Sequence, residues 1–182
     1  MVNSNYLGCA TKLAKEQLDF YTTNWVLEEK YDGWWCCLDI PKEGKITCTS
    51  RKNNLLEEAT DYFNSCFALK PMEHLTIIGE WLPESGQLMA FDLLRIGNNN
   101  LKTSTQFERR NLLEKYMPRK NRITLVHQYH TNFKYIFDMI TKRGGEGVVL
   151  KHLDSPYLSA RKDKKSYLWI KCKPEYSNDK AA

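Results

Sequence analysis

The sequence predicts an α+β domain with largely antiparallel sheets. Two observations favour this class: short apolar runs of strand length are separated by only a few helical segments, and several of the runs are joined by tight turns. The 182 residues fit one domain of ordinary size, and a hydrophobic share of 42% is enough for a substantial core. We therefore expect a folded domain rather than a disordered chain.

Strand-like segments make up most of the expected structure. The first two flank Asp32-Gly33, and a later pair flanks the four residues 83–86; both connections have the composition of turns. The strands that we expect are, in order, 25–30, 34–40, 46–50, 75–82, 87–96, 123–126, 147–151 and 167–172.

Three helices are expected between these strands. The first covers about 54–68, the second covers about 105–116 and stops before Pro118, and the third is closed by Gly144-Gly145. In the first and third, apolar residues recur every three or four positions, as they do on one face of a helix. These residues are Leu55, Ala59, Tyr62, Phe63 and Cys66, then Phe133, Ile136, Phe137 and Ile140.

Composition narrows the class of protein. The net charge of +5 is compatible with a polyanionic partner such as nucleic acid, and the run 161–165 concentrates part of that charge. The apolar runs are too short to span a membrane, and the first residues lack the pattern of a secretory signal. The six cysteines include no Cys-x-x-Cys pair, so we expect no zinc site. Reduced, mostly buried thiols indicate a cytoplasmic protein, or a nuclear one if the source is eukaryotic.

Lys30 is the first candidate for chemistry. A lone lysine before Asp32-Gly33 is most often a solvated strand residue. Here, however, Glu28 and Asp32 lie two positions to either side of Lys30, so on a strand the three side chains share one face. Three charges on one face of an otherwise apolar segment indicate a polar pocket.

Further charged residues occur at the ends of apolar strands. Glu80 ends one strand, Glu146 stands between two glycines before another, and Lys171 and Lys173 alternate with apolar residues and so share a face. Each is weak evidence alone. Together they supply two carboxylates suited to a divalent cation and cations suited to phosphates.

Six motifs then stand in one order over about 28–173, and with them the sequence resembles the covalent nucleotidyltransferases, which comprise DNA ligases, RNA ligases and mRNA capping enzymes. Two runs favour ATP-dependent DNA ligases within that group, namely Glu108-Arg109-Arg110 after the fourth motif and 153–157 before the last. The motifs are Glu28-x-Lys30-x-Asp32-Gly33, Ser50-Arg51, Gly79-Glu80, Phe91-Asp92-Leu93-Leu94, the run 146–151 and the run 169–173.

The resemblance implies a fold and an extent. It implies two largely antiparallel sheets flanked by helices, an ATP-grasp-like nucleotidyltransferase domain, over residues 1–176. It leaves 177–182 as a tail or the start of a linker. The OB-fold domain that follows in DNA ligases is expected to be absent from this chain and supplied in cis or in trans, and we expect a monomer.

The resemblance also implies a reaction with ATP and Mg²⁺. Lys30 would attack the α-phosphate of ATP to form lysyl-AMP and release pyrophosphate. AMP would pass to the 5′-phosphate of nicked double-stranded DNA, and the neighbouring 3′-hydroxyl would displace it and seal the strand. A free lysine is protonated at neutral pH, so the attacking amine must first lose a proton.

Site roles follow from the same resemblance. The implied catalytic residues are Lys30, Asp32, Lys171 and Lys173, and the implied Mg²⁺ ligands are Glu80 and Glu146. Phe91 would stack on adenine, Glu28 would accept from its amino group, Glu80 would contact the ribose, and Arg51 would bind the 5′-phosphate of the nick. The complete nucleotide-binding set is Glu28, Lys30, Arg51, Glu80, Phe91, Glu146, Lys171 and Lys173.

Two departures from the family pattern leave alternatives open. Trp35 stands where the family usually has arginine, and an indole cannot donate two hydrogen bonds to a phosphate or ribose as arginine can. The segment between Glu80 and Phe91 is also shorter than DNA ligases usually have. The alternatives are an RNA ligase or capping-type guanylyltransferase core, and a non-catalytic nick-binding module.

Overall fold

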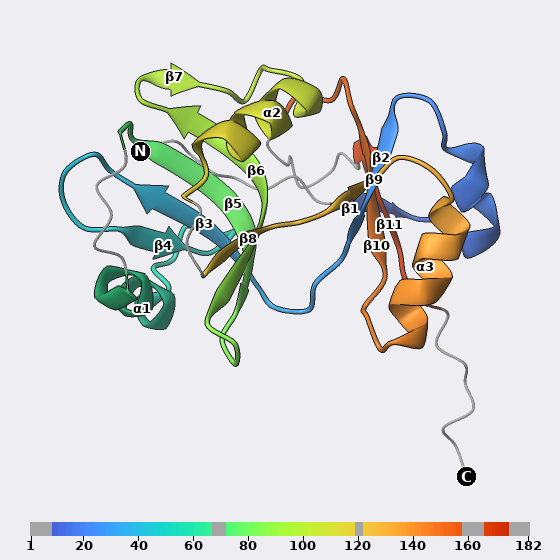
Figure 1. Ribbon diagram of the computed structural model, residues 1–182, viewed down its shortest axis with the longest axis horizontal. Coiled ribbons are helices and arrows are strands. Elements are labelled where there is room, and N and C mark those ends of the chain that lie inside the picture. Colours follow the sequence, from blue (N-terminus) through green and yellow to red (C-terminus); the bar gives the residue numbers. More distant parts are fainter. Residues whose placement is uncertain (1–8, 67–71, 119–121, 158–165, 175–182) are drawn as a thin grey trace, which may run out of the picture.

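The computed structural model describes residues 9–66, 72–118, 122–157 and 166–174. These residues form two mostly antiparallel sheets with a few helices, which confirms the predicted α+β class. Figure 1 shows the two sheets beside each other, with α3 next to one and α1 and α2 next to the other.

The first sheet carries the segments around Lys30 and Glu146. Within the described ranges, β1 and β11 are its one parallel pair, and the other neighbours run antiparallel. The strand order is β1 (Cys9–Lys12), β11 (Ser166–Cys172), β10 (Val148–His152), β2 (Trp25–Glu29) and β9 (Gln128–Tyr129).

The second sheet has six strands. A tight turn over residues 83–86 joins its two longest strands, β5 and β6, so the short separation between Glu80 and Phe91 is a plain hairpin. The order is β4 (Thr47–Thr49), β3 (Trp34–Ile40), β5 (Leu75–Leu82), β6 (Gln87–Ile96) and β7 (Asn99–Asn100), with β8 (Ile123–Leu125) pairing with β6.

The three predicted helices are confirmed with shifted ends. They are α1 (Glu57–Cys66), α2 (Gln106–Tyr116) and α3 (Phe133–Lys142). Residues 67–68 of the first expected helix lie outside the described part of the chain. Helix α2 begins with a capping box, in which Thr105 and Glu108 each bond the other's backbone N–H. A short 3₁₀ helix, η1 (Lys15–Phe20), was not expected.

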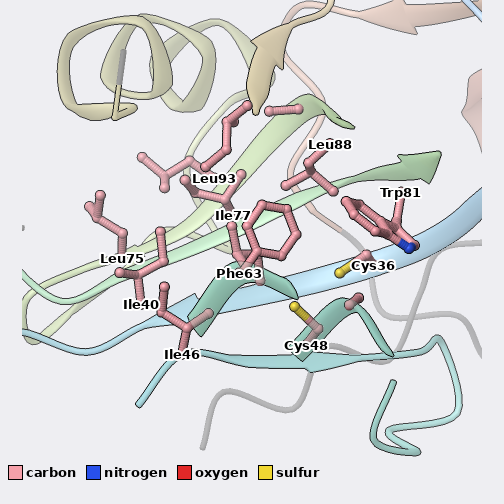
Figure 2. Close-up of a cluster of buried hydrophobic side chains, with 14 of the residues drawn as sticks. Cys36, Ile40, Ile46, Cys48, Phe63, Leu75, Ile77, Trp81, Leu88 and Leu93 are labelled. Carbon is pink, nitrogen blue, oxygen red and sulfur yellow. The ribbon is translucent and has the colours of Figure 1, made fainter. Parts of the chain in front are cut away.

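Three buried clusters hold these elements together. One lies between the six-stranded sheet and α1, where Phe63 packs against Trp81 at 5.1 Å between ring centroids (Figure 2). A second lies between the five-stranded sheet and α3. The third joins the two sheets, because it contains Trp35 and Ile78 from one sheet and Trp169 from the other. Each sheet is therefore covered on one side by a helix and meets the other sheet on its second side.

One connection differs from the sequence-based expectation. The Asp32-Gly33 turn does not close a hairpin, because β2 pairs with β10 and β9 while β3 pairs with β4 and β5. The turn instead carries the chain from one sheet to the other. Strands β1, β7 and β9 were also not expected. Among the described residues, the helices lack the length and apolar character that a membrane span requires.

Candidate active site

A pocket opens where the two sheets meet. Both sheets contribute side chains to its wall, which mixes charged and aromatic groups. The lining residues are Glu28, Glu29, Lys30, Tyr31, Trp35, Arg51, Glu80, Phe91, Val149, Lys151 and Trp169.

Lys30 lies directly after the last residue of β2, at the wall of this pocket. Its backbone N–H donates to the Gly147 carbonyl at 2.9 Å. This bond extends the pairing of β2 with β10 by one residue. Its Nζ pairs with Glu146 Oε2, and Lys173 Nζ pairs with Glu146 Oε1. One carboxylate thus holds both amines, which brings together three residues that the sequence had singled out.

The charge state of Glu146 follows from these contacts. Burial is the largest single effect and raises its pKa, but the hydrogen bonds from Lys173 and Lys30 and the charges of these lysines together leave the pKa below its ordinary value. Glu146 is therefore a carboxylate at neutral pH. It can orient the Lys30 amine, but it is a weak proton acceptor.

Gly147 is required for this geometry. Its φ is +131°, and a Cβ at this position would lie 2.2 Å from the Cys172 carbonyl oxygen. Any side chain there would push β10 away from β11 at the point where Glu146 and Lys173 meet.

The Glu28 side chain is almost completely buried and is held by other side chains of the protein. Its side chain is 3% exposed, and its two oxygens lie 2.5 Å from Lys151 Nζ and 2.8 Å from Gln128 Nε2. Arg110 Nη1 lies 3.9 Å away. Protein donors therefore fix the Glu28 carboxylate in the pocket wall, which leaves its remaining lone pairs for a ligand.

The aromatic part of the pocket is built around Lys151. Its ammonium lies 4.5 Å from the ring centroid of Phe91 and 4.3 Å from that of Trp169, and the two rings meet edge to face. Lys151 is 2% exposed. A cation seated against two rings holds their orientation, so the ring of Phe91 is preorganised as a stacking surface.

Glu80 and Trp35 are cross-strand partners on β5 and β3 and line the pocket together. Burial is the main reason that the pKa of Glu80 is raised to about 6; Lys30 and Arg51 lower it, and the charge of Glu146 raises it. Trp35 is 5% exposed and belongs to the cluster that joins the sheets. The indole therefore serves as an apolar wall at the position where the family pattern has a cation.

Gly33 makes this side of the pocket possible. A Cβ on Gly33 would lie 2.5 Å from the Trp81 carbonyl oxygen and 3.1 Å from Glu80 Cγ. The chain can therefore pass from β2 to β3 close against β5 only with glycine at this position.

The other expected site residues have different positions. Arg51 is exposed and lines the pocket, just beyond β4. Lys171 pairs in register with Val149, which pairs with Glu28, so these three side chains share the pocket face of the sheet. Asp32 is exposed and is not among the residues that line the pocket. Strand β2 ends at Glu29, so the alternation of side chains along a strand, which placed Asp32 on the same face as Lys30, does not extend to Asp32.

Several pocket residues were not singled out from the sequence. Lys151 is the last residue of the motif 146–151 and Trp169 is the first residue of the motif 169–173, but the sequence assigned neither of them a role. A signal was present for Trp169, because β11 places it on the same face as Lys171, and a lysine beside an aromatic residue on one strand face is unusual in a core. On β10, Lys151 shares its face with Val149, so the strand itself gives no such signal. No local signal distinguishes Glu29 or Gln128, because their partners are more than 90 residues away.

Comparison with known protein families identifies one that matches this chain. Residues 80–173 match the model of the ATP dependent DNA ligase domain. DNA ligase 4 of Candida glabrata is 33% identical over 94 residues, which cover 49% of this chain and 10% of that protein. A probable DNA ligase of Dictyoglomus thermophilum is 29% identical over an alignment that covers 82% of this chain and 31% of that protein. The chain therefore spans about a third or less of these relatives.

A solved structure agrees with the fold. The mycobacterial DNA ligase D complexed with ATP and MES superimposes with a TM-score of 0.76 at 22% identity, over 95% of this chain and 61% of that one. At this level of identity the likeness concerns the fold of the two sheets and their helices.

Proposed function

The chain belongs to the ATP-dependent DNA ligase family, and on that premise we propose that it is the adenylation domain of such an enzyme, with Lys30 as the nucleophile. The Lys30 amine would form a bond to the α-phosphorus of ATP while the bond to pyrophosphate breaks. The AMP group would then pass to the 5′-phosphate of nicked DNA, and the 3′-hydroxyl would displace AMP.

The observation that most supports this proposal is the shared carboxylate of Glu146. It holds the Lys30 amine at the wall of a pocket that also contains an aromatic ring and further charged groups. A nucleophile held in one orientation beside its substrate gains much of the rate advantage of an intramolecular reaction. Lys173, paired with the same carboxylate, is available to offset charge that builds on the transferring phosphate.

The residues around Lys30 fit a magnesium ion that arrives with the nucleotide. No group of three His, Cys, Asp or Glu side chains suited to a metal occurs within the described ranges. Mg²⁺, however, is commonly held by one or two carboxylates together with substrate phosphates, and Glu80 and Glu146 would supply those carboxylates. The ion would neutralise phosphate charge.

Recognition of the adenosine part would rest on Phe91 and Glu28. The Phe91 ring is backed by Lys151, and the Glu28 carboxylate retains accepting lone pairs for the adenine amino group. Arg51 is exposed beside the pocket and could bind the 5′-phosphate of a nick, with Lys171 on the pocket face of the sheet as a further cation.

The direct test is intact-mass measurement of the chain after incubation with ATP and Mg²⁺. We expect a gain of one AMP in the wild type, no gain in Lys30→Ala, and a normal gain in Lys42→Ala, which removes an exposed lysine elsewhere. Parallel incubations with GTP, and transfer to nicked DNA or to RNA ends, separate the ligase and guanylyltransferase alternatives. A wild-type chain that gains no AMP after long incubation contradicts the proposal and favours the non-catalytic module.

A further inference from the structure

A second set of contacts lies immediately beside Lys30 and is not used by the proposed reaction. Glu29, the last residue of β2, has a side chain that is 14% exposed. Its carboxylate accepts from Arg143 Nη2, and Tyr31 bonds to it with the phenol. The residues on both sides of Lys30 therefore meet at one carboxylate, that of Glu29, which Arg143 also holds.

Arg143 is fixed at the other end of this contact. It is the C-terminal cap of α3, where a positive charge is favourable to the helix dipole. Helix α3 is anchored through its buried face against the five-stranded sheet. The turn that follows is tight, because Gly144 N–H donates to Thr141 and Gly145 N–H donates to Ile140.

The turn also passes close to Glu29. A Cβ on Gly145 would lie 2.5 Å from Ile140 Cγ2 and 3.3 Å from Glu29 Oε1. The segment that begins at Arg143 therefore packs against Glu29 and continues directly to Glu146. Lys30 is tied to the same segment by its backbone bond to Gly147.

Two segments of the chain are thus connected on either side of the contact between Lys30 and Glu146. One carries Glu29, Lys30 and Tyr31, and the other carries Arg143 and Glu146. Burial first, and then the charge of Glu29 and its hydrogen bond, raise the pKa of Tyr31 to about 12, so the phenol keeps its proton and remains a donor. The protonation state of Tyr31 therefore does not change in the physiological pH range.

We propose that Glu29, Arg143 and Tyr31 are positioning residues that set the Lys30 amine relative to Glu146 and the nucleotide. The inference rests on the proposed function, since it concerns how fast Lys30 is adenylated. A nucleophile displaced by a fraction of an ångström reacts more slowly even when the substrate still binds. Loss of the Arg143 guanidinium, which is not among the residues that line the pocket, lowers the maximal rate of adenylation and leaves the ATP dependence unchanged.

Arg143→Ala is the informative variant, because the guanidinium side chain is 61% exposed and its removal leaves the core intact. Single-turnover adenylation is measured over a range of ATP concentrations. We expect a maximal rate lower by about tenfold, a half-saturating ATP concentration within about twofold of wild type, and partial recovery in Arg143→Lys. Glu29→Gln, which keeps an acceptor for Tyr31, is expected to lie between Arg143→Ala and wild type.

Lys134→Ala is the matched control, because it removes an exposed ion pair with Asp138 on the same helix. Its rate is expected to equal the wild-type rate. A wild-type rate in both Arg143→Ala and Glu29→Gln, or a change confined to the ATP dependence, overturns the positioning role.

A second readout separates this inference from the proposed function. The rate at which acetic anhydride modifies Lys30, mapped by peptide mass, needs no ATP. Arg143→Ala is expected to raise that rate relative to wild type and to Lys134→Ala, because the amine is less firmly held. Absence of an AMP adduct in the wild type counts against the proposed function alone, whereas equal acetylation in all three proteins counts against the positioning role.

Discussion

Lys151 Nζ lies 2.5 Å from Glu28 Oε2, and both side chains are almost completely buried. The pair joins two neighbouring strands of the five-stranded sheet, and its cation also lies against the rings of Phe91 and Trp169. Both the polar and the aromatic halves of the pocket therefore depend on one ammonium group.

Replacement of that ammonium should be costly. In Lys151→Met the shape of the side chain is nearly kept, but the Glu28 charge is left buried with Arg110 at 3.9 Å as its remaining cation. We expect the free energy of unfolding to fall by about 3–5 kcal/mol, measured by urea denaturation. Lys134→Met, which breaks an exposed pair, should cost less than about 1 kcal/mol. Equal losses in the two variants would contradict this account.

Glu80 gives a pH-dependent prediction. Its pKa is raised from 4.5 to about 6, so the folded state favours the protonated form, and the stability this confers is present below pH 4.5 and lost as pH rises through 6. Glu80→Gln should therefore gain stability relative to wild type at pH 8 but not at pH 4.5, by no more than about 2 kcal/mol. Thermal unfolding at the two pH values measures the difference, and a difference of opposite sign would refute the assignment.

Phe91 tests the proposed stacking surface. Phe91→Ala removes the ring and should raise the half-saturating ATP concentration for adenylation by roughly tenfold or more, because base–aromatic stacking contributes about 1–3 kcal/mol. Phe91→Tyr keeps a ring and should stay near wild type. Titration of the adenylation rate with ATP gives both values. If Phe91→Ala instead lowers only the maximal rate, the ring acts on the reacting group rather than on the base.

Two glycines provide a steric comparison. Gly147→Ala would place a Cβ 2.2 Å from a carbonyl oxygen at a φ of +131°, whereas Gly144 has a φ of +87° with nothing within 4 Å. We expect Gly147→Ala to destabilise the fold by about 3 kcal/mol or more and Gly144→Ala by about 1 kcal/mol. Denaturation midpoints of the two variants measure this contrast, and similar midpoints would argue against a close approach of β10 and β11.

The local structure was largely predictable, but the pairing of strands was not. The bounds of β5 and β6 follow from two apolar runs with a turn between them, and both ends agree with the structure. The turn at Asp32-Gly33 has the same local character, yet it joins two sheets. Which strand pairs with β2 is decided by residues 148–152, far along the chain, and no local pattern contains that information.

In the candidate site, too, some residues could be predicted from the sequence and others could not. Lys30, Glu80, Phe91 and Glu146 lie together as their motifs implied, because motif order along the chain reflects a shared fold. Asp32 was placed by strand alternation and lies outside the pocket lining, since the strand had already ended. Lys151 and Gln128 reach Glu28 from positions that only the folded sheet brings near.

The contact between Lys30 and Glu146 spans 116 positions of sequence. During synthesis, Lys30 leaves the ribosome long before Glu146 and Lys173 exist, so the amine has no fixed partner until nearly the whole domain has emerged. Contacts between residues far apart in the sequence slow folding, because the entropy of closing a long loop must be overcome before the contact forms. The contacts of Lys30 with Glu146, and of Glu146 with Lys173, are therefore complete only when nearly the whole domain is present, and the adenylation that we propose for Lys30 would depend on that completion.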